Sequence, residues 1–228
     1  MSFGNLPNYA KEMERNYIKN LIAQGEHLHL DFKFEISDAR KIARSLVAFA
    51  NTSGGRLLVG VKDNGVIAGV RSDEEIYMIE TAAHIFCKPE VAFVANNHLV
   101  DGRTVVEVIV EKSTNLPHYA PGKDDKWTAY LRVHDENLVA NKVQLKVWKR
   151  LSNQNGVYLK YTDAEKQLLS YIEAFGEVTF SKACRIAQTS KNKTENLLAN
   201  LIAIGILEPV FKDQQISYGI KSVGNFNY

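Results

Sequence analysis

The sequence has few cysteines and no long apolar run. Its 228 residues contain two cysteines, Cys87 and Cys184, which lie far apart and match no metal-ligand spacing. Such cysteines are typical of small buried side chains in a reducing compartment, which excludes a fold held together by disulfides. No stretch approaches the ~18 apolar residues of a membrane span, and the polar N-terminus lacks the apolar core of a signal peptide. We therefore expect a cytoplasmic protein without a membrane partner.

A strong charge of one sign is also missing. Charged residues make up 24% of the chain, and the formal net charge is +2. A general basic coat for nucleic acid is thereby excluded, so any surface for a polyanion has to be local. The apolar content of 45% is that of an ordinary globular protein, and the length allows one large domain or two small ones.

Helical and strand patterns interleave over residues 1–151. Helices are expected over 11–23, 37–51, 72–86 and 136–151, the second of them with Ser37 as its N-cap. Strands are expected over 27–34, 56–62, 91–95, 104–112 and 128–133. This alternation predicts an α/β domain, or an α+β domain with a mixed sheet.

The strand expected over 27–34 has two different faces. One face is apolar and contains Leu28, Leu30, Phe32 and Phe34. The other is polar and contains His27, His29, Asp31 and Lys33. Because no Cys or further His stands at a zinc-like spacing, we interpret the two histidines as surface residues.

The block AFANTSGGRLLVGVKDNG, residues 48–65, joins a helix to a strand and ends in a tight turn. Asn51 and the pair Gly54-Gly55 stand at the junction. They could contact a phosphate or sugar through the Asn51 side chain and exposed amides, or they could simply end the helix and reverse the chain. The block lacks the G-x-x-x-x-G-K-[ST] pattern, and its glycines do not open a helix, so ATP binding is disfavoured.

A change of pattern marks a second domain. The polar segment SNQNG, residues 152–156, is a predicted linker. Three helices are expected over 162–176, 180–188 and 191–205, followed by two strands over 206–210 and 215–220. This order predicts a winged helix-turn-helix domain over 157–228.

Basic residues of the second domain suit contact with nucleic acid. Lys191 and Lys193 open the third helix, where a recognition helix approaches base edges and phosphates, and Lys182 and Arg185 precede it. Winged helices also serve as protein-interaction modules, so that interpretation stays open.

The helix expected over 136–151 carries a basic stripe. Its members stand at i, i+4, i+7 and i+8 and are Lys142, Lys146, Lys149 and Arg150. A polyanionic partner would relieve the repulsion between these like charges. A solvated basic face explains the stripe equally well.

Four motifs together resemble the Schlafen AlbA-2 domain. They are EHLHLDFK from residue 26, AFANTSGG, LLVGVKDNGVIAGV and AYLRVHDENLVA, and the resemblance covers roughly residues 15–145. It implies a compact α/β unit that binds nucleic acid. In animal Schlafen proteins two such lobes face each other, which implies that this single-lobed chain forms a homodimer.

The resemblance also implies candidate site residues. An acidic trio in the family carries metal-dependent RNA cleavage, and it falls here on Glu26, Asp31 and Asp63, with Lys33 placed to neutralise phosphate charge. Mg²⁺ or Mn²⁺ would be the cofactor of such a nuclease. Asp31 departs from the Glu that is more common in the family, and its shorter side chain would displace a metal, which puts catalysis in doubt more than the fold.

A basic strand position of the family falls on Arg132, and Tyr130 shares its face. An Arg beside an aromatic ring suits phosphate contact and base stacking, whereas an exposed strand pair is the alternative. Together these observations favour a nucleic-acid-binding protein, with DNA preferred over RNA and transcription regulation as the role. The alternatives are a metal-dependent endoribonuclease acting on tRNA or single-stranded RNA and a winged-helix protein-interaction module. Outside the nuclease interpretation no cofactor is expected.

Overall fold

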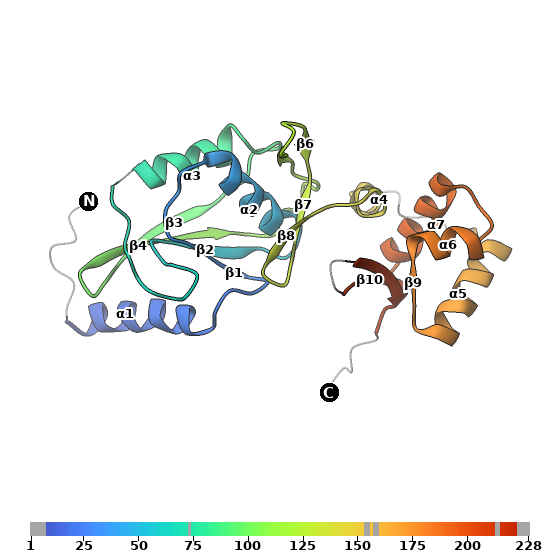
Figure 1. The fold of residues 1–228 in the computed structure, drawn as a ribbon, viewed down its shortest axis with the longest axis horizontal. Helices are drawn as coiled ribbons and strands as arrows, with labels where there is room; N and C mark the ends of the chain where they lie inside the picture. Colours follow the sequence, from blue (N-terminus) through green and yellow to red (C-terminus); the bar gives the residue numbers. More distant parts are fainter. Residues whose placement is uncertain (1–7, 73, 153–155, 157–159, 213–214, 223–228) are drawn as a thin grey trace. The chain divides into compact units, whose positions relative to one another are not determined.

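The computed structural model describes residues 8–72, 74–152, 156, 160–212 and 215–222. The chain divides into two compact units, Met1–Ala140 and Asn141–Tyr228. Figure 1 shows the helices and strands of both, and each unit has its own hydrophobic core. None of the helices in the described ranges combines the length and the apolarity that a membrane crossing requires.

A four-stranded mixed sheet with the order β1-β2-β4-β3 forms the centre of the first unit. β1 (Leu30–Lys33) runs parallel to β2 (Gly55–Val59). β4 (Arg103–Val110) runs antiparallel to β2 and to β3 (Val94–Val100). The prediction of a mixed sheet within an α+β domain is therefore confirmed.

Helices cover both faces of this sheet (Figure 1). α1 (Asn8–Ala23) packs on one face, where its Ile18 joins Leu30 and Phe32 in a small core. α2 (Ala39–Asn51) and α3 (Glu74–His84) pack on the other face in a larger core. Side chains alternate along a strand, so Asp31, between Leu30 and Phe32, belongs to the α2 side.

Local chemistry sets both ends of α2. Asp38, rather than the predicted Ser37, is the N-cap, and its carboxylate accepts a hydrogen bond of 2.9 Å from the Arg40 amide. Gly54 has a φ of 74° and donates its N–H to the Phe49 carbonyl at 2.9 Å. A Cβ on Gly55 would lie 2.3 Å from the Phe49 ring. These contacts favour the helix-stop interpretation of the two glycines.

Two short hairpins complete the first unit. β5 (Ala120–Pro121) pairs with β6 (Trp127–Thr128), and β7 (Tyr130–Val133) pairs with β8 (Glu136–Val139). Residues 136–139 are thus a strand and not the beginning of the predicted helix. A tight turn joins β7 to β8 and places Val133 opposite Glu136. His134 in this turn has a φ of 52°.

The second unit contains four helices and a three-stranded antiparallel sheet of order β10-β11-β9 within its described residues. The helices are α4 (Lys142–Leu151), α5 (Asp163–Phe175), α6 (Phe180–Ile186) and α7 (Lys191–Ala203). The strands are β9 (Glu177–Thr179), β10 (Leu207–Lys212) and β11 (Gln215–Ile220). The three helices and the hairpin expected after residue 157 are present, and β9 is a strand that the sequence pattern did not reveal.

The predicted boundary at residue 151 differs from the observed division, which places α4 in the second unit. Val143 and Val147 of α4 lie in the core of that unit together with Leu198. The N-cap residue Asn141 donates from Nδ2 to the Tyr218 hydroxyl at 3.2 Å. Most of the predicted linker, residues 153–155, lies outside the described residues.

One free cysteine lies in each unit. Cys87 is 1% exposed and packs in the larger core of the first unit. Burial raises the pKa of its thiol to about 12. Cys184 of α6 is only partly buried.

Candidate nucleic-acid interface

Asp31 and Arg132 meet inside the first unit. Their exposures are 3% and 2%. Nη2 of Arg132 lies 3.3 Å from Oδ1 of Asp31 and donates to the Leu30 carbonyl at 3.3 Å, while the guanidinium stands over the Phe49 ring. Because the Arg132 side chain is buried, it cannot make the predicted contact with a phosphate. β7 packs against α2, and from there the Arg132 side chain reaches Leu30 and Asp31 of β1.

A second acid joins Asp31. Glu26 accepts a hydrogen bond of 2.9 Å from the Phe32 amide, and Nζ of Lys33 lies 2.9 Å from Oδ2 of Asp31. Burial, followed by the hydrogen bond and the charge of Asp31, raises the pKa of Glu26. Two members of the predicted acidic trio thus lie together, with the predicted cation Lys33 bound to one of them.

Asp63, the third member, stands apart. It is exposed in the turn closed by the hydrogen bond of 2.7 Å from the Gly65 amide to the Lys62 carbonyl. Within the described residues, no group of three or more His, Cys, Asp or Glu side chains is placed to hold a metal ion. Glu26, Asp31 and Asp63 therefore do not come together to form the Mg²⁺ or Mn²⁺ site that the resemblance implies.

Asn51 is a buried crosslink between segments. It is 3% exposed, and its Nδ2 donates to the carbonyls of His118 and Tyr130 at 2.9 and 2.8 Å. Its Oδ1 accepts from the His118 amide at 2.8 Å. Tyr130 is also buried, with 6% exposure. Contrary to the prediction, neither Asn51 nor Tyr130 presents its side chain to a ligand, because both hold the 113–133 region against α2.

The ring of His118 extends this crosslink. Its Nδ1 lies 2.9 Å from the Pro89 carbonyl and its Nε2 lies 2.7 Å from Oγ of Ser113. A carbonyl only accepts, so Nδ1 donates to Pro89, and the ring ties Ser113 to Pro89. Sequence reasoning missed His118, although its place between two prolines in LPHYAP marked an irregular segment.

A further polar cluster, centred on the buried Glu107 and His98, joins α1 to the sheet. His98 of β3 lies 2.9 Å from a Glu14 carboxylate oxygen and 3.1 Å from one of Glu107. Tyr17 donates to Glu107 at 2.6 Å, and Arg56 lies 3.0 Å from the same carboxylate. The hydrogen bond to Glu107 raises the pKa of His98, against the opposing effect of burial. Burial disfavours the charge on Glu107, but the hydrogen bonds from His98 and Tyr17 outweigh it and lower the pKa of Glu107.

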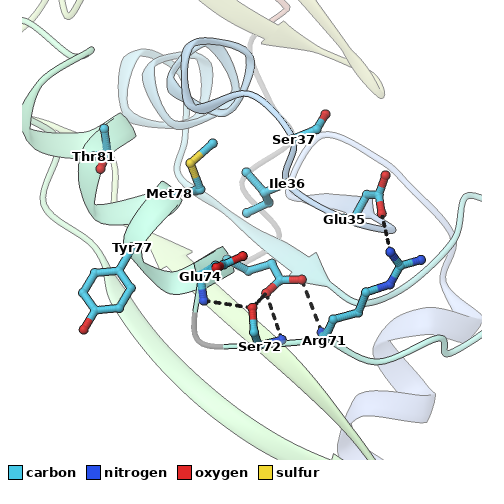
Figure 2. Close-up of a pocket in the computed structure, with 10 residues that line it drawn as sticks. Glu35, Ile36, Ser37, Arg71, Ser72, Glu74, Tyr77, Met78 and Thr81 are labelled. Carbon is cyan, nitrogen blue, oxygen red and sulfur yellow. Dashed lines mark hydrogen bonds and ion pairs between the residues drawn. The ribbon is translucent and has the colours of Figure 1, made fainter.

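Acidic groups outnumber basic ones in a pocket on the first unit's surface. A pocket of about 480 Å³ lies beside the start of α3, with Glu35, Arg71, Glu74 and Tyr77 among its lining residues (Figure 2). Glu75 accepts from the amides of Arg71 and Ser72 and thereby caps α3. Residues 1–140 contain sixteen Lys and Arg and nineteen Asp and Glu, a formal net charge of −3. This unit is therefore a poor electrostatic match for a polyanion.

The positive charge of the protein belongs to the second unit. Residues 141–228 contain twelve Lys and Arg and seven Asp and Glu, a formal net charge of +5. The predicted contact residues that are exposed here are Lys142, Lys149, Arg185, Lys191 and Lys193. Lys182 is half-buried, with its ammonium 5.4 Å from the centre of the Tyr171 ring.

Two members of the predicted basic stripe on α4 face α7 instead of solvent. Nζ of Lys146 lies 2.8 Å from a Glu195 carboxylate oxygen and donates to Oδ1 of Asn192 at 2.6 Å. Arg150 donates to Oδ1 of Asn196 at 3.0 Å and to that of Asn200. Lys146 and Arg150 therefore bind another helix of the unit, whereas Lys142 and Lys149 stay exposed for a partner.

Residues 26–141 contain the mixed sheet of the first unit and the Asn51 crosslink. The family model for the Schlafen AlbA_2 domain matches residues 26–141, so the chain belongs to this family. This is the family that the sequence motifs predict.

Solved structures are similar to the chain at low identity. A crystal structure of a Corynebacterium diphtheriae protein shares 18% identity with a TM-score of 0.48, over 92% of this chain and 39% of that one. The solution structure of the N-terminal domain of a Nitrosomonas europaea protein, described as related to the ATP-dependent DNA helicase RecG, shares 21% identity with a TM-score of 0.39. That match covers 55% of this chain and 91% of the domain. The chain thus spans well under half the length of the Corynebacterium protein.

Proposed function

We propose that this protein binds duplex nucleic acid, DNA in preference to RNA, through its second unit, and that it acts in DNA-linked regulation in the cytoplasm. The distribution of charge carries this proposal, because the second unit has a formal net charge of +5 and the first has −3. Lys142, Lys149, Lys191 and Lys193 are exposed and form no ion pair with any described residue. Exposed cations of this kind attract the phosphate backbone.

We further propose that the second unit is a winged helix-turn-helix. Its order α5–β9–α6–α7–β10–β11 and its antiparallel sheet β10-β11-β9 support this assignment. In such a domain the start of the third helix, here Lys191–Lys193, lies towards the nucleic acid.

Homodimerisation is part of the same proposal. β3 stands at the edge of the sheet, and its Val94 and Leu99 are 58% and 52% exposed. An edge strand with apolar side chains suits pairing with a second copy of itself about a twofold axis. Sedimentation equilibrium should show a dimer for the wild type and a monomer for Leu99→Lys. A wild-type monomer at all concentrations would remove this part.

Salt-dependent binding tests the main proposal. Fluorescence anisotropy with a duplex of about 25 base pairs, between about 50 and 200 mM salt, should give a log–log slope of about −0.9 per phosphate neutralised. The double variant Lys191→Ala/Lys193→Ala should lower the affinity about tenfold and reduce the slope by about 2. A matched RNA duplex tests the preference for DNA.

A matched control separates local contact from general charge. The double variant Lys41→Ala/Lys123→Ala removes two exposed lysines from the first unit and should leave the affinity within about twofold. Equal losses in the two double variants, or no duplex binding at about 50 mM salt, would contradict the proposal. A duplex affinity that does not change with salt concentration would favour the protein-interaction alternative.

A further inference from the structure

α7 is enclosed on two opposite sides. Leu197, Leu198 and Leu201 lie on one side of the helix and are buried in the core of the second unit. The opposite side carries a stripe of side chains at i, i+4 and i+8, which are Asn192, Asn196 and Asn200. These three accept hydrogen bonds from Lys146 and Arg150 of α4. α4 therefore covers the asparagine stripe of α7.

This cover leaves little of α7 for contact with DNA. Residues 194–203 are all buried or half-buried, and the exposed residues of the helix are those of its first turn, 191–193. A recognition helix reads bases by laying several turns of side chains into the major groove. With α4 in place, the three asparagines that could pair with base edges are bound to α4 instead.

α4 is an integral part of the unit. Val143 and Val147 lie in the shared core, and Asn141 anchors the start of the helix to Tyr218 of β11. The pair between Lys146 and Glu195 is largely shielded, with side-chain exposures of 24% and 11%. Removal of α4 would expose these apolar groups and leave Glu195 without its partner. DNA therefore binds the form of the unit in which α4 covers α7.

We infer that the second unit binds the DNA backbone without reading its sequence, through Lys142 and Lys149 of α4 and Lys191 and Lys193 of α7. The contact between Lys146 and Asn192 holds the two helices side by side, which brings both lysine pairs to the same part of the unit. The inference rests on the proposed function and specifies its ligand as the phosphate backbone of duplex DNA. In the regulatory role, the choice of a genomic site then comes from another part of the protein or from a partner.

Selection from a random-sequence duplex library tests the absence of base reading. After several rounds of selection by the full chain, the selected pool should bind within tenfold of the starting pool and show no shared motif. A selected pool that binds more than tenfold tighter would overturn the inference. That result would leave the proposed function intact, whereas failure to bind any duplex would remove both.

A covalent link between the helices tests whether α4 stays in place. Lys146→Cys/Asn192→Cys, made together with Cys184→Ser, allows a short bis-maleimide to join α4 to α7, and the same protein without the linker is the control for the lost side chains. The linked and unlinked forms should bind duplex DNA within about twofold of each other. A tenfold loss on linking would show that α4 has to leave α7 for binding, and it would overturn the inference.

Discussion

The two units treat their polar side chains in opposite ways. In the first unit, three polar residues of the family motifs point inward: Asn51, Asp31 and Arg132 are each at most 3% exposed. In the second unit, cations such as Lys142, Lys149, Lys191 and Lys193 remain exposed. The buried polar residues of the first unit thus fix its own fold, while several cations of the second unit remain exposed to solvent.

This difference shows that a polar residue within a family motif need not contact a ligand. A buried charge is tolerated when partners and hydrogen bonds surround it, as the carbonyls and Asp31 surround Arg132, and the loss of one partner then destabilises the fold. An exposed lysine stabilises the fold little, so its substitution changes binding instead. Substitutions in the two units should therefore separate stability from binding.

The largest effect on stability is expected from Arg132→Met. The variant leaves the buried Asp31 with Lys33 as its remaining cationic partner and removes the hydrogen bond to the Leu30 carbonyl, so the free energy of unfolding of the first unit should fall by about 3–5 kcal/mol. Urea denaturation followed by circular dichroism measures this change. Lys41→Met, which changes an exposed cation on the same unit, should alter stability by less than about 0.5 kcal/mol. An equally small change for Arg132→Met would break the contrast between the two units.

Asn51→Ala should have the next largest effect. It leaves two buried carbonyls and one buried amide without partners, and we expect a loss of about 2–3 kcal/mol. DNA affinity at a temperature where the variant is folded should stay unchanged. A variant that keeps its stability and loses binding would instead assign Asn51 to the interface.

The cluster around His98 should make the docking of α1 depend on pH. The pKa of His98 is raised in the folded state, so its contribution is fully present below its unfolded pKa, about 6.5, and is lost as pH rises through the raised value. The loss should be on the order of 1 kcal/mol. When the free energy of unfolding is measured across this pH range, its decrease with rising pH should be smaller in His98→Gln than in the wild type. A wild type whose stability does not depend on pH here would contradict the contacts described for His98.

The smallest effect on stability is expected from Lys191→Ala/Lys193→Ala. Both side chains are exposed at the start of α7, so the free energy of unfolding should change by less than about 0.5 kcal/mol while DNA affinity falls. Thermal denaturation alongside the anisotropy titration checks both parts. A large destabilisation would mean that these lysines serve the fold, as Arg132 does.

Local signals predicted much of the fold. The apolar alternation of 104–112, the capped pattern of 162–176 and the glycines at 54 and 55 each agree with an observed element or helix end. The environment of Asp31 could not be predicted in this way. Its neighbours on β1 identify the apolar face, but the polar face is covered by β7, whose Arg132 is about a hundred residues away in sequence.

The assignment of α4 failed for the same reason. Its stripe of cations is visible in the sequence, but its asparagine partners on α7 stand 46 and 50 residues further along the chain. The amphipathic pattern of α4 shows that one face is buried and does not show which core buries it. Strand β9, with three residues, is too short to give a periodic signal.

The cysteines provide a chemical reporter in each half of the molecule. Because Cys87 is enclosed and its thiol has a pKa of about 12, alkylating reagents can modify it only when the surrounding helices and sheet separate. Cys184 is partly accessible and should react first. The labelling rate of Cys87 can therefore follow the opening of the first unit, with Cys184 as the fast-reacting internal reference and without an introduced probe.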